Sequence, residues 1–127
     1  MNFAMRKDLT VGYDEALAKV PDALKSEGFG VLTEIDVKQT LKAKINVDFR
    51  RYKILGACSP PLAHEALSTV LEVGLMLPCN VVVYENDDGK ATVLAIDPTS
   101  TVAAAQPALS KMAEVVRDKL SRVLEKL

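Results

Sequence analysis

Residues 79–96 read CNVVVYENDDGKATVLAI and predict a β-hairpin. The turn NDDG at residues 86–89 separates two runs rich in β-branched residues, which predict strands over Cys79–Glu85 and Lys90–Ile96. Three consecutive valines at residues 81–83 make the first of these strands apolar on both faces. A strand that is apolar on both faces is buried on both, so we expect it to lie in the centre of a sheet.

The segments before the hairpin alternate between strand and helix patterns. The resulting order, β-α-β-α-β-α-β-β-α, predicts the α+β class, with one compact domain over residues 1–127 and helices packed on a mixed or antiparallel five-stranded sheet. Pro21 falls inside the first helix and predicts a kink or a missing hydrogen bond there. The further strands are predicted over Phe3–Leu9, Val31–Ile35 and Tyr52–Cys58. The first helix is predicted to start at a cap, either Thr10 or Gly12, and to stop at Gly28, and the other helices are predicted over Val37–Ile45 (capped by Asp36), Leu62–Leu71 (opened by Pro60-Pro61) and Pro107–Leu127.

Composition narrows the possible partners and the compartment. The 127 residues are 26% charged with a net charge of −1, and the two signs are interspersed, so no basic surface for nucleic acid is expected. No run reaches the 18 or more apolar residues of a membrane-spanning helix, and the first residues lack the apolar core of a signal peptide. We therefore expect a cytoplasmic protein whose two cysteines are thiols, with neither a membrane nor a nucleic-acid partner.

The scarce reactive side chains gather around two predicted strand ends. Cys58 ends one strand, Cys79 begins the next, and the only histidine, His64, follows Cys58 by six residues. If the two strands are antiparallel neighbours, both thiols lie at one end of the sheet; if they are parallel, the thiols lie about 17–20 Å apart. Backbone N–H groups at the start of the following helix would favour an anion or a thiolate there. Asn80 and Glu34 complete this candidate site.

The residues leave three uses of this candidate site open. Cysteine is among the most buried residue types, so both thiols can simply fill the core. Cys58 with His64 could form a thiol-dependent enzyme or a redox sensor. Cys58, His64 and Cys79 could ligate a metal, although zinc ligands usually include one closely spaced pair and no metal is expected.

Other polar residues have simpler explanations. Asp36 suits a helix cap, which leaves Glu34 without a partner for acid–base catalysis. Ser59 lies before Pro60 without the G-x-S-x-G pattern of a nucleophile elbow, so a capping role is expected. The sequence contains no recognisable cofactor, calcium or phosphate motif.

Several blocks share a pattern with one protein family: EGFGVLTEIDV at 27–37, YKILGAC at 52–58, PLA at 61–63, GLMLPCNVVVYE at 74–85 and DP at 97–98. Through them, nearly the whole chain resembles the bacterial and archaeal family called domain of unknown function 302. The resemblance implies a compact α+β domain, encoded as a small stand-alone protein that forms a homodimer, and no established activity. Pro21 is the visible departure, because family members usually build that helix without proline.

The combined expectation is a dimeric protein that binds a small molecule or a partner protein, without a cofactor. The last helix carries one apolar stripe, which we expect to pack on the protein's own sheet. The connection at residues 70–77 adds further apolar side chains between glycine and proline, and we expect it to be exposed and to contribute to the dimer contact. Its apolar members are Val70, Val73, Leu75, Met76 and Leu77; those of the stripe are Leu109, Met112, Val116, Leu120, Val123 and Leu127.

Overall fold

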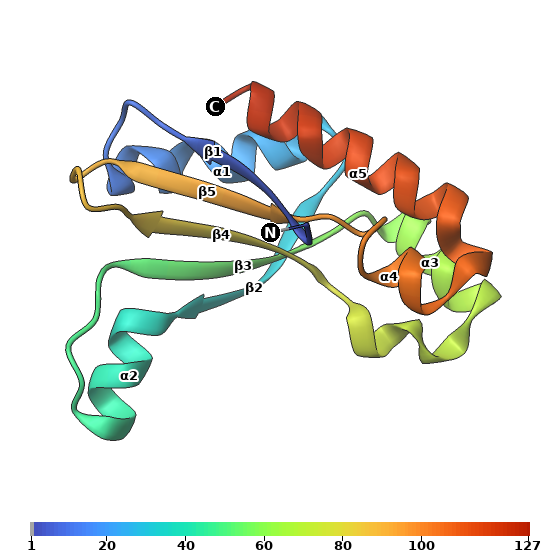
Figure 1. Ribbon diagram of the computed structural model, residues 1–127, viewed down its shortest axis with the longest axis horizontal. Helices are drawn as coiled ribbons and strands as arrows, with labels where there is room; N and C mark the ends of the chain where they lie inside the picture. The colour runs from blue at the N-terminus through green and yellow to red at the C-terminus, as the bar shows by residue number, and fades with distance from the viewer. Residues whose placement is uncertain (1) are drawn as a thin grey trace.

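The computed structural model describes residues 2–127, in which five strands form one antiparallel sheet (Figure 1). The strand order is β1-β5-β4-β3-β2, so β4 lies in the centre, as its run of valines predicted. The α+β class is confirmed, and the sheet is wholly antiparallel. The strands are β1 (Ala4–Asp8), β2 (Gly30–Asp36), β3 (Tyr52–Cys58), β4 (Cys79–Glu85) and β5 (Ala91–Ile96).

Within residues 2–127, five α-helices and two short 3₁₀ helices connect and flank the strands. Three short elements, η1, α4 and η2, were not predicted, because they are too brief to show a helical period. The predicted last helix is divided: η2 holds Pro107 in its first turn, and α5 begins only at Ser110. The helices are α1 (Tyr13–Ser26), α2 (Val37–Ile45), α3 (Pro60–Thr69), η1 (Leu71–Met76), α4 (Val102–Ala105), η2 (Pro107–Leu109) and α5 (Ser110–Glu125).

Helices α1 and α5 pack on one face of the sheet, and Figure 1 shows α1 behind β1. The core between the layers is made of aliphatic side chains, and the alternation of β4 sends Val81 and Val83 into it. Leu120 and Val123 of α5 are buried there, as the predicted stripe requires. No helix covers the opposite face in the part of the chain that the structure describes.

Ionic and capping contacts hold α1 and α5 at their ends. Gly28 ends α1 in a left-handed conformation (φ 84°), with the Phe29 N–H donating to the Leu24 carbonyl (3.0 Å), which is a Schellman motif. Glu27 accepts from Arg122 (2.9 Å) and Lys126 (2.7 Å) of α5 and its C-terminal turn. Helix α1 is continuous through Pro21, whose ring is exposed and whose nitrogen has no proton to donate.

Helix α2 stands apart from the sheet at the turn between β2 and β3 (Figure 1). The Gln39 N–H donates to the Asp36 carboxylate (3.0 Å), so the predicted cap is present. The helix ends at Asn46, which adopts the left-handed conformation that asparagine tolerates well (φ 56°). None of its residues is buried, so α2 contributes little to the core.

The connection at residues 70–77 is only partly exposed, which corrects the expectation of one outward patch. Val73 is buried in a second small core with Ala66 and Leu109, and Val70 and Leu77 pack against it. Leu75 is 92% exposed, and Leu71 and Met76 also face outward. The structure therefore divides this segment into an inner half that packs on α3 and η2 and an outer half that remains accessible.

Candidate functional site

The two cysteines lie at the same end of the sheet. Strand β3 ends at Cys58 and β4 begins at Cys79, and the antiparallel register pairs Ala57 with Cys79. Both cysteines are free thiols of intermediate exposure, and both line one cavity. This is the placement that follows from antiparallel neighbouring strands.

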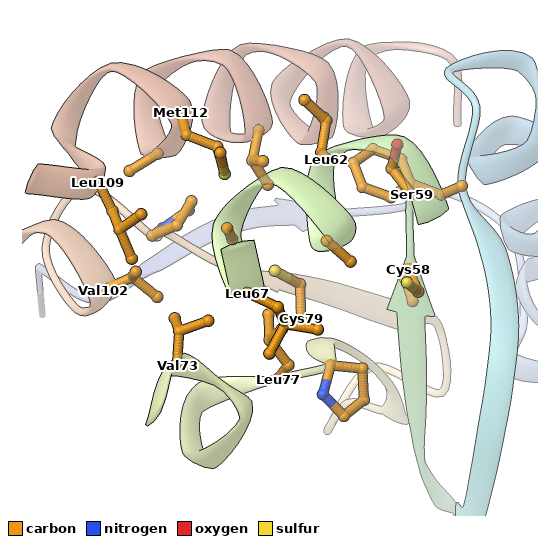
Figure 2. A pocket seen from close by; sticks show the side chains of 18 of the residues that line it. Cys58, Ser59, Leu62, Leu67, Val73, Leu77, Cys79, Val102, Leu109 and Met112 are labelled. Atoms are coloured by element: carbon orange, nitrogen blue, oxygen red, sulfur yellow. The ribbon is translucent and has the colours of Figure 1, made fainter. Parts of the chain in front are cut away.

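The cavity has a volume of about 330 Å³ and lies between the end of the sheet and the helices α3, α4 and α5. Figure 2 shows Cys79 beside Leu67 and Leu77, whereas Cys58 lies by the arrowhead of β3. Apart from Ser59 and the two thiols, the lining side chains are hydrocarbon or thioether groups. They are Phe29, Leu32, Ala57, Leu62, Ala63, Ala66, Leu67, Val73, Leu77, Pro78, Pro98, Val102, Leu109, Met112, Ala113 and Val116.

Small residues on two facing helices leave this space unfilled. Ala63 and Ala66 of α3 and Ala113 of α5 present only methyl groups to the cavity. The resulting space is partly open to solvent, and its lining comes from elements far apart in the sequence.

The start of α3 supplies one hydroxyl group and few amides. Ser59 is the N-cap residue, yet its side chain makes no capping hydrogen bond, and it lines the cavity instead. Pro60 and Pro61 occupy the first helical positions and have no N–H to donate. The expected cluster of N–H groups is therefore not available here. None of the cavity-lining side chains in residues 2–127 is charged.

Burial changes the acidity of Cys79. Desolvation, with a smaller contribution from the neighbouring Cys58, raises the pKa of the Cys79 thiol to about 11. Only the thiolate is a strong nucleophile or a good metal ligand, so at neutral pH Cys79 behaves as a small apolar group. Its environment is the opposite of the electropositive surroundings that activate catalytic cysteines.

His64 does not join the cysteines. Helix α3 begins at Pro60, two residues earlier than predicted, so His64 lies beyond the first turn, where it is exposed and lines no part of the cavity. In residues 2–127 no group of three His, Cys, Asp or Glu side chains is placed to hold a metal ion. The alternative use of Cys58, His64 and Cys79 as metal ligands therefore has no support here, because His64 is exposed on α3 and lies outside the cavity.

Glu34 and Asn80 also lie outside the cavity. Glu34 accepts a hydrogen bond from Lys53 (2.6 Å) across the β2–β3 pair, so its carboxylate has a surface partner. Asn80 is exposed on β4, opposite Gly56, on the sheet face away from α1 and α5. The structure thus keeps two of the five candidate residues, Cys58 and Cys79, in one place and separates the other three from them.

Most of the cavity wall could not be found by searching for reactive residues. Met112 was assigned to the stripe on the sheet, but it borders the cavity as well, and Leu67 and Val73 resemble ordinary core residues. The one feature of the sequence that indicated a cavity was the presence of alanines in α3 and α5, since small residues on facing helices leave space between them. That indication becomes useful only when the helices are known to face each other.

The family model for Domain of unknown function DUF302 matches residues 5–127. The chain belongs to the DUF302 family. This confirms the family indicated by the sequence blocks. No curated protein matches the chain.

A solved DUF302 structure shares the complete fold. The crystal structure of an uncharacterized conserved DUF302 protein from Bacillus stearothermophilus matches with a TM-score of 0.91 at 33% identity. The match covers 99% of this chain and 98% of that chain. The elements that enclose the cavity therefore belong to a fold that both proteins share. Within residues 2–127, no helix combines the length and hydropathy needed to cross a bilayer.

Proposed function

We propose that this DUF302 protein binds a small, uncharged, apolar molecule in the cavity beside Cys79. The observation that carries the proposal is the cavity itself, whose 330 Å³ are lined almost entirely by apolar side chains. Small-molecule sites commonly measure about 300–1,000 Å³ and are mostly apolar. An engineered apolar cavity of about 150 Å³ holds benzene, so the present volume corresponds to roughly a dozen carbon atoms.

The lining also limits the chemistry of the ligand. A buried charge without a partner is strongly disfavoured, and the cavity offers no charged side chain to a ligand. Ser59, with its uncapped hydroxyl, and the two thiols can provide at most a few weak hydrogen bonds. The fitting class is therefore an aliphatic or aromatic hydrocarbon group that carries no more than one hydroxyl or carbonyl.

The proposed binding protein acts as a homodimer. One observation supports assembly: one face of the sheet has no covering helix and carries partly exposed aliphatic side chains. Two-fold dimers are the commonest assembly of soluble proteins.

Naphthalene, an uncharged ten-carbon probe, tests the cavity. We expect it to raise the midpoint of thermal unfolding, because a ligand that binds only the native state stabilises it. Its carboxylate derivative, 2-naphthoate, should bind at least about tenfold more weakly, since its charge has no partner in the cavity. Titration followed by amide NMR shifts gives both affinities and shows whether the responding residues line the cavity.

A cavity-filling variant supplies the matched protein control. Ala66→Leu should occupy part of the cavity and weaken naphthalene binding at least about tenfold, because the added carbon atoms use the volume that the probe needs. The same substitution at Ala43, which is exposed on α2, should leave binding unchanged. Equal affinities for naphthalene in both variants would contradict the proposed site.

The thiol-dependent alternative makes a different claim. A nucleophilic or redox role needs an accessible thiolate, whereas burial raises the pKa of Cys79 and His64 lies outside the cavity. These observations support ligand binding over thiol chemistry.

A further inference from the structure

We infer that a second copy of this chain docks on the open face of the sheet, the face opposite α1 and α5. The inference rests on the proposed homodimer and names its interface. In Figure 1 this face is turned toward the viewer, with no helix in front of the strands. The observations that support it are the residue pattern of the face, its charges and its size.

The open face carries a continuous row of aliphatic side chains across four strands. The registers pair Ile35 with Ile54, Ile54 with Val82, and Val82 with Leu94, so these four residues lie side by side from β2 to β5. A surface strand normally places polar residues on its solvent side. This face instead repeats the pattern of a covered one.

Aromatic side chains extend the row toward one end of the sheet. Tyr52 and Tyr84 are cross-strand partners whose rings stack at 5.6 Å, and Phe49 packs on Tyr52 at 6.1 Å. Tyrosine and phenylalanine are enriched in the cores of protein interfaces. The row and the aromatic group together form one apolar surface.

This apolar surface is accessible to a partner. Ile35 is 49% exposed, and Ile54, Val82 and Leu94 are each partly exposed. Their chain neighbours Leu55, Val81 and Val93, which point toward α1 and α5, are almost completely buried. The difference arises because only one face of the sheet is covered by helices.

The charges around the surface are compatible with a second copy. On this face the three inner strands carry only uncharged residues, which are Tyr52, Ile54, Gly56, Asn80, Val82, Tyr84, Thr92, Leu94 and Ile96. Thr92 is fully buried and donates a hydrogen bond to the Asp8 carboxylate (2.6 Å). Arg6 pairs with Asp8 (3.1 Å) on the edge strand β1, and the guanidinium of Arg50, which pairs with Asp87 (3.2 Å), lies over the Tyr84 ring at 5.8 Å. Two identical faces therefore meet without unpaired like charges in the middle, whereas a highly charged partner finds no complementary group there.

The size of the face suits a dimer of moderate strength. Five strands about 4.8 Å apart and about 20 Å long give roughly 450 Å² per copy in projection. Side chains protrude from the sheet, so the accessible area is larger than this projected area. Two copies together therefore reach the approximately 1,000 Å² that a specific interface requires. Stacked sheets pack about 10 Å apart, which would bring Ile54, Val82 and Leu94 of the two copies into contact.

A lysine in the middle of the face tests the interface. Sedimentation velocity of the full chain, from low to high micromolar concentration, should show the wild type as a dimer of twice the 13.8 kDa chain mass. Val82→Lys should raise the dimer dissociation constant about 100-fold or more, because a two-fold interface would bury two unpaired charges. Leu75→Lys, the same type of change at a position that is 92% exposed on η1, should leave the dimer intact.

The outcomes separate the interface from the dimer itself. A wild type that stays monomeric at every concentration would overturn both the homodimer and this interface, while naphthalene binding would still test the cavity independently. A dimer that survives Val82→Lys, or that dissociates with Leu75→Lys, would overturn the proposed interface on the open face but not the homodimer itself. Ile35→Lys, at a half-exposed edge position, provides a second test if Val82→Lys does not fold, with circular dichroism as the check on folding.

Discussion

Replacing Leu120 with alanine is expected to lower the free energy of unfolding by about 3–5 kcal/mol. Leu120 is fully buried on α5, in the main core between the helices and the sheet. The loss combines the transfer energy of the removed carbons with the cost of the space they leave, because the surrounding structure relaxes only partly. Urea denaturation followed by circular dichroism measures the change.

A matched substitution on the same helix defines the background. Val115→Ala, at a position that is 44% exposed, is expected to change the free energy of unfolding by no more than about 0.5 kcal/mol. Similar losses for Leu120→Ala and Val115→Ala would contradict the packing of α5 on the sheet. The comparison separates core packing from any general effect on helix formation, since both changes introduce alanine into α5.

Raising the pH from about 9 to 11 is expected to remove about 2 kcal/mol of stability through Cys79 alone. The folded state holds the pKa of this thiol at about 11, against an ordinary value of 9.0. Below pH 9 the thiol is protonated in both states, so its contribution to stability is fully present there. Between pH 9 and 11 the unfolded chain releases the proton first, which favours unfolding, and each unit of pKa difference corresponds to about 1.4 kcal/mol.

Comparison with Cys79→Ala isolates this contribution from the tyrosines and lysines that titrate in the same range. The wild type should lose more stability than the variant between pH 9 and 11, and the two curves should be parallel below pH 9. In the native protein at neutral pH, the thiolate population of Cys79 should be about 100-fold lower than that of an ordinary thiol, and alkylation should be correspondingly slow. Fast alkylation of Cys79 at pH 7 would instead support a thiol-dependent activity.

The sequence was most informative where one local interaction decides the structure. The NDDG turn and its flanking strands were predicted correctly, because the Asn86 side chain accepts from the Asp88 and Lys90 amides within the turn. Helix α2 was predicted at its observed bounds, since Asp36 caps it directly. The alternation of β4 and the stripe of α5 indicated which side chains are buried.

The site was less predictable, because it depends on contacts between distant segments. The strand-end argument related Cys58 to Cys79, but it could not show that alanines of α3 and α5 face each other across an open space. His64 was placed near Cys58 by sequence distance alone, and a shift of the helix start by two residues carried it outward. The uncovered sheet face likewise required knowledge of which side α1 and α5 occupy.

A crystal of the protein under xenon pressure tests the central proposal most directly. Xenon binds dry apolar cavities and reports both their position and their occupancy. We expect a xenon atom beside Cys79, within the space lined by Leu67, Val73 and Met112. A cavity filled by ordered water, or one closed by the collapse of α3 toward α5 with no xenon bound, would contradict an apolar ligand site.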